Sequence, residues 1–502
     1  MRASVIDLGY NSLKMVSYET RPDDSFRAYE QRGSLTRLGE GLHQTGFLGQ
    51  EAMERTLREL ELLREVNRLS GIDRVIAIAT SPIREAGNGY RFQREAESML
   101  GVKFKVISGK EEALFSYIGA ARATRLPNVL FFDLGGGSLE FTYAKGFRVR
   151  KTLSLPLGAL RMSELYGRQG GRYSKKDYDK MRLRIAELLP TREELGLDDG
   201  TVLLGVGGTI RALAKYDQWI RDYPLNKLHN YRLRRKSIFA INKRLRKMDS
   251  RKIAGVEALG RDRADSIAAG SLVISTIMNR LKFDEVVVST HGLRDGVLSE
   301  YLRDPARYSL EEFDEARANS ALAGWYGKET GTEVFSDALV SKGIVTLGEK
   351  LILDEAIESF LDLYLKTRPE SLFYTILNED SYLDHRDQIA LALSLVRAKT
   401  PRTANWFYER YRSVLKDKSR ESIDKLAAFI QVAEVLELTK STARIRLRDG
   451  SIRFEVTTPQ KDFPSLLLEQ AARELEDATG RIVKTMIHRT KEREQIAPME
   501  GR

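Results

Sequence analysis

The chain has 502 residues, which at about 150 residues per domain divides into roughly three domains. Lysine and arginine total 82 against 71 aspartate and glutamate, a formal charge of +11, so a polyanion is the first partner class to consider. Cysteine is absent, which excludes disulfides, thiolate nucleophiles and cysteine-ligated zinc.

The amino terminus has no basic stretch followed by an apolar core, because a strand-like run with Val5 and Ile6 begins almost at once. No segment approaches the run of about 18 apolar residues that spans a membrane. With 42% hydrophobic residues and no low-complexity tract, the composition predicts a soluble, cytoplasmic, globular protein without a membrane partner.

Up to about residue 300, short β-rich runs alternate with longer helical patterns, which is typical of an α/β protein. Helices are predicted where leucines recur near helical spacing, over 51–70, and again over 174–189. A break at Pro127 and Asn128 predicts a boundary between two α/β lobes. The predicted strands are 5–7, 75–79, 104–107, 129–133, 202–206 and 286–289.

Helical patterns dominate from about 310 to 440, which predicts a separate, mostly helical domain. Two runs in which apolar and polar residues alternate, 443–447 and 452–456, then flank Asp449-Gly450. This dipeptide is typical of a hairpin turn. A helix over 465–478 and a strand over 482–487 complete a small α+β unit. The predicted domains are therefore 1–126, 127–303, 304–440 and 441–502.

Three glycine-containing turns each follow an apolar run. In the first, Asp7-Leu-Gly-Tyr-Asn-Ser12, a strand-end carboxylate and freed backbone N–H groups suit a metal and a phosphate, although an ordinary strand-loop fits equally well. The second, Asp133-Leu-Gly-Gly-Gly-Ser138, is sharper, because three glycines let the backbone approach an anion; a flexible tight turn is the alternative. The third, Gly205-Val-Gly-Gly-Thr209, precedes a helix predicted over 210–216 and is by itself a common connection.

Two adjacent carboxylates, Glu111 and Glu112, begin a predicted helix between the first two turns. Successive helical residues point about 100° apart, so only one of the two can face a cleft. The alternative is that both stabilise the helix N-terminus through its dipole. Arg84 follows another predicted strand and is either a bidentate clamp for phosphate oxygens or a surface residue.

Six motifs occur in a fixed order over residues 1–303: Asp7–Ser12, Ala79–Arg84, Ser108–Ala113, Asp133–Glu140, Gly205–Thr209 and Gly292–Gly296. That order resembles the exopolyphosphatase / guanosine pentaphosphate phosphatase family, which belongs to the actin, sugar-kinase and chaperone-ATPase superfamily. The resemblance implies an α/β fold of two ribonuclease-H-like (actin-like) lobes, followed by a mostly helical HD-like domain and the small α+β unit.

The resemblance also implies processive hydrolysis of the terminal phosphoanhydride of inorganic polyphosphate, which releases orthophosphate. Carried over to this chain, Glu112 would be the general base on water, and Arg84 would neutralise charge near the scissile group. Asp133 would hold Mg²⁺ (or Mn²⁺), with Asp7 and Glu140 as further metal ligands. The implied phosphate-binding residues are Asp7, Gly9, Asn11, Ser12, Gly135, Gly136, Gly137, Ser138, Gly207, Gly208 and Thr209.

Other functions share parts of this pattern. Guanosine pentaphosphate 5′-phosphohydrolysis would use the same residues, so the sequence does not separate it from polyphosphate hydrolysis. A sugar-kinase-type phosphotransferase shares the glycine turns, but the Glu-Glu-Ala segment argues against it. A non-catalytic polyphosphate sensor would not need Glu112, Asp133 and Arg84 together.

The sequence departs from the family at two places. Tyr10 replaces a small residue in the first turn, which predicts a narrower turn or a stacking contact. In the helical region the best match to an HD-type metal motif is Asp384-His385-Arg386-Asp387, and no other histidine lies between 304 and 440. A dinuclear site needs several histidines, so we expect a degenerate HD-like domain without metal.

The stretch 227–252 contains eleven lysines or arginines and one acid, Asp249. Apolar residues at helical spacing predict an amphipathic helix with a basic face, which is either solvated or a track for a phosphate polymer. The predicted partners are accordingly inorganic polyphosphate, or alternatively guanosine pentaphosphate, and no nucleic acid. Family members are often dimers, so we expect a homodimer. The predicted track residues are Arg234, Arg235, Lys243 and Arg246.

Overall fold

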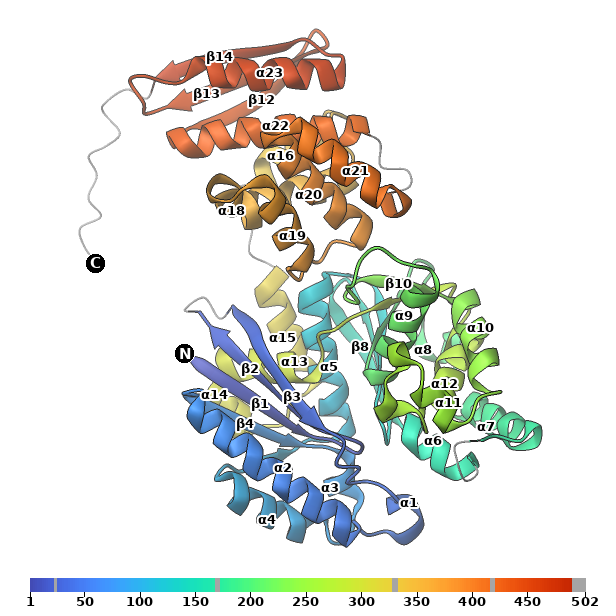
Figure 1. The fold of residues 1–502 in the computed structure, drawn as a ribbon. Helices are drawn as coiled ribbons and strands as arrows, with labels where there is room; N and C mark the ends of the chain where they lie inside the picture. The colour runs from blue at the N-terminus through green and yellow to red at the C-terminus, as the bar shows by residue number, and fades with distance from the viewer. Residues whose placement is uncertain (22–24, 168–171, 327–332, 416–419, 490–502) are drawn as a thin grey trace. The chain divides into compact units, whose positions relative to one another are not determined.

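The computed structural model describes residues 1–21, 25–167, 172–326, 333–415 and 420–489 (Figure 1). The chain divides into two compact units, Met1–Gly327 and Lys328–Arg502. The last residues of the predicted α+β unit, 490–502, lie outside the described part. No helix among the described residues is long and apolar enough to cross a membrane.

The first lobe is a five-stranded sheet with helices against it. Its strand order is β3-β2-β1-β4-β5, in which β1, β2 and β3 form an antiparallel meander and β4 and β5 join in parallel. Apolar residues of β1 and β2 pack against α2 and α4, which forms one core of the lobe. The elements are β1 (Arg2–Leu8), β2 (Leu13–Thr20), β3 (Phe26–Ser34), α1 (Leu42–Thr45), α2 (Gln50–Leu69), β4 (Arg74–Ala79), α3 (Ser81–Glu85), α4 (Gly89–Leu100) and β5 (Phe104–Val106).

The second lobe repeats this arrangement and adds an edge strand, in the order β10-β11-β9-β6-β7-β8. Again a three-stranded antiparallel meander is continued by parallel strands. The elements are β6 (Val129–Leu134), β7 (Leu139–Lys145), β8 (Arg148–Leu155), α6 (Ala159–Tyr166), α7 (Lys175–Leu188), α8 (Arg192–Leu195), β9 (Val202–Val206), α9 (Gly208–Ile220), β10 (Tyr231–Arg234), α10 (Arg235–Leu245), α11 (Ser250–Ala254), η1 (Glu257–Leu259), η2 (Arg261–Arg263), α12 (Ile267–Arg280) and β11 (Glu285–Val288).

Two helices cross between the lobes. Helix α5 (Gly109–Thr124) follows the last strand of the first sheet, and α13 (Leu293–Arg303) follows β11 of the second. A Cβ at Gly119 of α5 would lie 2.1 Å from the carbonyl oxygen of Gly292, and one at Gly296 of α13 would lie 1.9 Å from that of Phe115. Only glycine permits so close a crossing, and it places the start of α5 between the two sheets.

Two further helices, α14 (Pro305–Leu310) and α15 (Glu315–Tyr326), belong to the first unit although they follow the boundary predicted near 303. The predicted domain limits themselves remain predictions. The second unit confirms a mostly helical region, whereas its likeness to an HD-type domain stays a prediction. Its helical elements are α16 (Glu333–Ser341), α17 (Leu347–Glu355), η3 (Ala356–Phe360), α18 (Leu361–Lys366), α19 (Pro369–Asn378), α20 (His385–Lys399), α21 (Pro401–Leu415) and α22 (Arg420–Thr439).

The second unit ends in a three-stranded sheet, ordered β12-β13-β14. The predicted hairpin is present, and Asp449 and Gly450 both have positive φ, of 53° and 73°, as a tight hairpin turn requires. Helix α23 connects β13 to β14, which run parallel. The elements are β12 (Thr442–Arg448), β13 (Ser451–Thr458), α23 (Ser465–Thr479) and β14 (Val483–Arg489).

The prediction of one helix over the basic stretch was wrong. Its first part, β10, is an edge strand antiparallel to β11, with Tyr231 and Leu233 buried and the arginines between them exposed. Helices and edge strands can both carry cations on their solvent-exposed face. The many Lys and Arg residues therefore concealed the alternation of buried and exposed positions that is typical of a strand. The apolar residues expected at helical spacing do lie buried on α10.

Candidate active site

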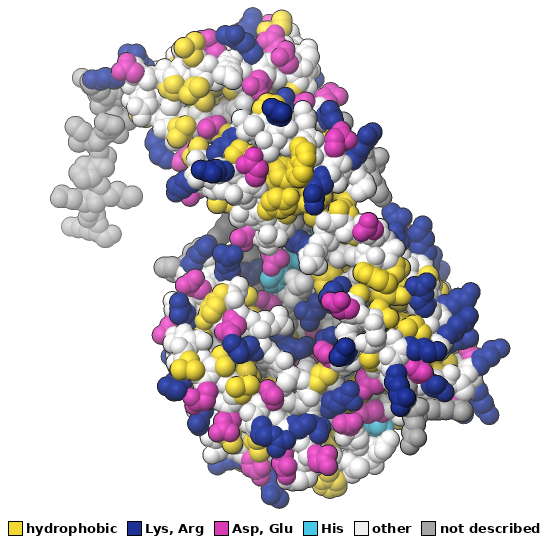
Figure 2. All heavy atoms as spheres, in the orientation of Figure 1, with side chains coloured by type: hydrophobic (Ala, Val, Ile, Leu, Met, Phe, Trp, Pro, Cys, Tyr) yellow, Lys and Arg dark blue, Asp and Glu magenta, His cyan; other side chains and the backbone are white. Residues whose placement is uncertain are grey.

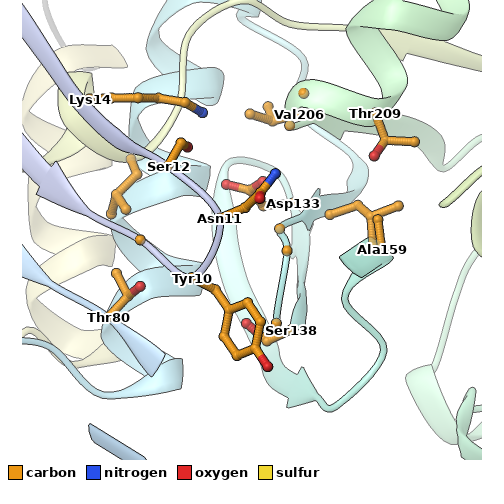
Figure 3. Close-up of a pocket in the computed structure, with 18 of the residues that line it drawn as sticks. Tyr10, Asn11, Ser12, Lys14, Thr80, Asp133, Ser138, Ala159, Val206 and Thr209 are labelled. Atoms are coloured by element: carbon orange, nitrogen blue, oxygen red, sulfur yellow. The ribbon is translucent and has the colours of Figure 1, made fainter. Parts of the chain in front are cut away.

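All three glycine turns line one cavity of about 130 Å³ between the two lobes (Figure 3). The first turn joins β1 to β2, the second joins β6 to β7, and the third precedes α9. The implied phosphate-binding residues are thus brought together from positions more than two hundred residues apart in the chain. They are all among the residues that line the cavity, as are Glu112 and Asp133.

The first two turns share one backbone design. The N–H of Gly9 donates to the carbonyl of Ser12 at 3.1 Å, and the N–H of Gly135 donates to that of Ser138, also at 3.1 Å. In the second turn the carbonyls of 135–137 accept hydrogen bonds from N–H groups of 158–161 at the start of α6. The N–H groups of Gly136 and Gly137 donate to no acceptor in the described part of the chain, so they can serve a bound anion.

Side chains of the first turn occupy the space that the glycines of the second leave open. A Cβ at Gly136 would lie 2.9 Å from the Cβ of Asn11, and one at Gly137 would lie 2.6 Å from the Tyr10 ring. The Tyr10 ring also presses on Gly39 and lies 5.7 Å from the Arg161 guanidinium. Tyr10 therefore stacks, as the sequence allowed, and the two turns interlock.

The third turn packs closely against the second. Gly207 has φ of 110°, and a Cβ there would lie 2.5 Å from the carbonyl oxygen of Leu134 and 3.1 Å from Oδ1 of Asp133. Residues Gly208 and Thr209 begin α9, so this helix directs its N-terminus, with its unsatisfied N–H groups, into the cavity. This end of the cavity favours negative charge.

Of the two adjacent carboxylates, only Glu112 lines the cavity. Glu111 belongs to the helix cap, since it accepts the backbone N–H of Ser108 at 2.9 Å and that of Phe313 at 3.1 Å. It also lies 3.6 Å from the Lys105 ammonium. The geometry agrees with the expectation that the two side chains point in different directions.

The Glu112 carboxylate is buried, and its Oε2 accepts no hydrogen bond from a described residue. Burial, followed by the charge of Glu140, raises its pKa well above the usual glutamate range, while Arg84 opposes the shift. The guanidinium of Arg84 lies 3.6 Å from Oε2 of Glu112 and donates to the carbonyl of Ile107 at 2.6 Å. Arg84 is not among the cavity-lining residues, so it contacts Glu112 from outside the lining.

The two acids of the second hairpin differ in position. Asp133 lines the cavity and accepts a hydrogen bond from Ser116 at 2.9 Å, and burial raises its pKa. Glu140, its partner across the strands, is fully buried outside the lining and accepts a hydrogen bond from Ser154 at 3.0 Å. Burial and the charge of Asp133 raise the Glu140 pKa to about 8.

Four cations in the cavity lining were not predicted: Lys14, Arg211, Arg263 and Arg294. Arg294 pairs with Asp7 at 3.1 Å. Burial, followed by the charges of Arg294 and Arg211, lowers the pKa of Lys14 to about 7. Lys14 lies directly across the hairpin from Asp7, and Arg294 belongs to the motif Gly292–Gly296. Both could therefore have been found from nearby sequence. Arg263 could not, because only the fold brings it over Gly208.

The four predicted track residues do not line this cavity. Arg235 pairs with Asp284 at 2.8 Å, and the Arg246 guanidinium lies 5.5 Å from the Tyr178 ring centroid. Lys and Arg side chains gather over the outer face around α10 in Figure 2. A role for these residues in holding a phosphate polymer remains a prediction.

Comparison with known proteins shows which family the chain resembles. Residues 21–304 match the Ppx/GppA phosphatase family. Over 312 residues the chain is 26% identical to a bifunctional 3-dehydroquinate synthase/phosphatase of Fusobacterium nucleatum, a match that covers 60% of this chain and 46% of that protein. It is also 26% identical over 310 residues to exopolyphosphatase 2 of Mycobacterium tuberculosis, covering 59% of this chain and 97% of that one.

Two solved structures share the fold of the lobes. The Ppx/GppA family member of Aquifex aeolicus matches with a TM-score of 0.51 at 25% identity, covering 61% of this chain and 99% of that one. An exopolyphosphatase of Cytophaga hutchinsonii matches with a TM-score of 0.57 at 23% identity, with the same coverage. These likenesses confirm the predicted two-lobed, actin-like architecture. The chain therefore belongs to the Ppx/GppA phosphatase family, whose exopolyphosphatases are phosphoanhydride hydrolases.

Proposed function

We propose that the protein is a Mg²⁺-dependent exopolyphosphatase that removes the terminal phosphate of inorganic polyphosphate. The observation that carries this proposal is the placement of Glu112 in the one described cavity where three glycine turns meet. Its carboxylate is buried, and its Oε2 lies 3.6 Å from the Arg84 guanidinium but accepts no hydrogen bond from a described residue. Phosphoryl transfer needs positioning, charge neutralisation and an activated water. The glycine turns would position the phosphates, the lining cations would neutralise charge, and Glu112 would activate the water.

In this mechanism Glu112 takes a proton from the attacking water. The water oxygen bonds to the terminal phosphorus, and the bond from that phosphorus to the bridging oxygen breaks. The electron pair stays on that oxygen, which leaves as the new end of the shortened chain, and orthophosphate is released. The raised pKa makes Glu112 a stronger base than an exposed glutamate, and Arg84 limits the shift so that the carboxylate is available. Backbone N–H groups of the second turn and the start of α9 would hold the phosphate oxygens.

The donor set fits a hard divalent cation. Asp133 presents a buried carboxylate to the cavity, and Asp7 lies opposite on the first hairpin. No three His, Cys, Asp or Glu side chains of the described residues form a metal cage, but Mg²⁺ is usually held by one or two carboxylates, water and substrate phosphates. When bound, Mg²⁺ would neutralise phosphate charge. Asp133 is the better-placed ligand, because Asp7 already pairs with Arg294 and Glu140 lies outside the lining.

The dimensions of the cavity support action at a chain end. Its volume, about 130 Å³, is smaller than the roughly 300–1,000 Å³ of pockets that enclose a drug-sized ligand. A terminal phosphate group and its neighbour fit such a space better than a whole nucleotide does. Lys14, Arg211, Arg263 and Arg294 supply the positive charge that such an anion requires.

Guanosine pentaphosphate is the second candidate, because it too ends in a phosphoanhydride and would use the same residues. The decisive assay measures phosphate release from long polyphosphate and from guanosine pentaphosphate side by side. Glu112→Gln should lower kcat by roughly 10²–10⁴-fold on whichever substrate is used. Glu111→Gln is the matched control, since it alters the neighbouring cap carboxylate and should leave kcat nearly unchanged. Normal turnover by Glu112→Gln would refute the base assignment.

A further inference from the structure

The sheet β12-β13-β14 at the end of the second unit has one covered and one open face. Ile445, Ile452, Phe454 and Val456 are buried on the covered face, as are the apolar residues of α23. The alternate residues on the three strands point the other way and, apart from the buried Ser451, are exposed or half-exposed. The fold of this unit therefore leaves a sheet face without a partner in the described part of the chain.

That open face is strongly basic. Arg444, Arg446 and Arg448 alternate along β12 and are exposed. Arg453 on β13 stands directly across from Arg446, and Lys484 on β14 is in register with Arg453. Among the described residues of the face there is one carboxylate, Glu455, which pairs with Arg446 at 3.0 Å.

The arrangement of these cations is unfavourable for the isolated protein. Like charges directly opposite on neighbouring strands destabilise a sheet, and Arg446 and Arg453 are such a pair. The Nε of Arg453 is buried and donates to no partner among the described residues. A bound polyanion would relieve the repulsion between Arg446 and Arg453, so charge complementarity points to an anionic polymer on this face.

We propose that the open face binds single-stranded nucleic acid. Alternate residues on a strand are roughly 6.8 Å apart. That spacing is close to the separation of successive phosphates along an extended nucleotide strand. Neighbouring phosphates of polyphosphate share one oxygen and lie much closer together. Four of the five cations are arginines, which contact phosphates bidentately and stack on bases through the guanidinium plane.

The layout of the unit supports the same assignment. A sheet backed by helices, with RNA lying across its open face, is how the RRM module recognises single strands. This face carries no exposed Phe, Tyr or Trp in the described strands, so arginine would provide the stacking, beside the exposed Met486 and His488. The proposal is independent of the hydrolytic activity and reverses the expectation that nucleic acid is not a partner.

The test measures binding of a labelled 12-nucleotide oligouridylate to the full-length protein by fluorescence anisotropy at several salt concentrations. The triple variant R444Q/R446Q/R453Q should bind at least tenfold more weakly. Its salt slope should be lower by about 2, because each lost phosphate contact contributes about 0.7 for single strands. Thermal unfolding should be unchanged or occur at higher temperature, since the Arg446 and Arg453 repulsion is removed. The single variant R453Q should show a smaller loss and covers the case in which the triple variant fails to fold.

The matched control, K236Q/K247Q/K252Q, removes the same charge from exposed lysines on α10 and in the segment that follows it, and leaves the predicted track residues intact. It should change oligouridylate affinity by less than about twofold, because phosphate contacts and not net charge determine the affinity. An equal loss in the control would overturn the proposal, because binding would then be unspecific. Polyphosphate that displaces the oligonucleotide more effectively, charge for charge, would also overturn it and assign the face to polyphosphate. That competition is run in a Glu112→Gln background so that the competitor is not consumed.

Discussion

The first and second glycine turns occupy equivalent places in two lobes of the same topology, yet they differ in chemistry. Asp7 pairs across its hairpin with Lys14, whereas Asp133 pairs with Glu140 at the same register position. The first turn carries Tyr10 and Asn11 where the second carries glycines, and those side chains fill the space above the glycines. One backbone design thus carries an acid–lysine pair in the first hairpin and a pair of acids in the second.

The interlocking of the turns gives the largest expected effect outside the base itself. Gly137→Ala places a Cβ 2.6 Å from the Tyr10 ring, so the turns must separate, and misplacement by about 1 Å costs on the order of 10²-fold in rate. Phosphate release from polyphosphate measures the loss. The double variant Tyr10→Ala/Gly137→Ala should recover part of it. If the double variant is no better than the single one, the contact between the turns does not set their spacing.

Amide substitutions of the equivalent acids, Asp7 and Asp133, distinguish the roles of the two hairpins. Asp133→Asn should reduce kcat roughly tenfold or more beyond Asp7→Asn, because Asp133 is the freer ligand for Mg²⁺ while Asp7 is neutralised by Arg294. Titration of activity with Mg²⁺ for both variants checks this. Equal losses would mean that the hairpins contribute equivalent ligands.

Lys14 is expected to act in binding. Its pKa of about 7 means that it is charged below that pH and loses its charge above it, unless a bound phosphate raises the value. The KM of the wild-type protein should therefore rise as pH increases through 7–8. Lys14→Met should raise KM about tenfold at pH 6 with a smaller effect at pH 9. A pH-independent KM in the wild type would contradict this role.

The smallest expected effect is a displacement of the pH profile of kcat. Glu112 works as a base when deprotonated, so activity falls as pH decreases through its pKa in the complex. Glu140 raises that pKa and Arg84 lowers it. Glu140→Gln should therefore move the acid limb to lower pH, and Arg84→Met should move it to higher pH. Displacement of both variants in the same direction would contradict the assignment.

The central strands were predictable because β1, β4, β6, β9 and β11 are short apolar runs, as parallel strands buried on both faces must be. Strands β3, β7 and β8 of the two antiparallel meanders were missed for the opposite reason. β3 is mostly exposed, β8 alternates, and β7 carries Glu140 and Thr142 in its buried stretch. Polar residues in such strands conceal the pattern on which sequence-based prediction depends.

The features of the candidate site also fall into two groups, those that the local sequence indicates and those that depend on the fold. The glycine turns and the two glutamates are local features, so the sequence indicated them, and the order of the motifs indicated the family. Burial and distant neighbours are not local. The raised pKa of Glu112, the position of Glu140 behind the lining and the cation Arg263 over Gly208 each depend on segments far apart in the chain.

By itself, the sequence indicated three glycine turns suited to a phosphate and excluded thiol chemistry, and its resemblance to a family predicted Glu112 as the base. The tertiary structure decided that these turns meet. Two helices cross at Gly119 and Gly296 with no room for a Cβ, and this crossing brings the carboxylate of one lobe to the glycines of the other. It also decided where the positive charge lies, because strand register and not composition gathers the arginines of β12 and β13 on one face. Composition counts charges, but only the fold sets the distances between them, and electrostatic interactions depend on those distances.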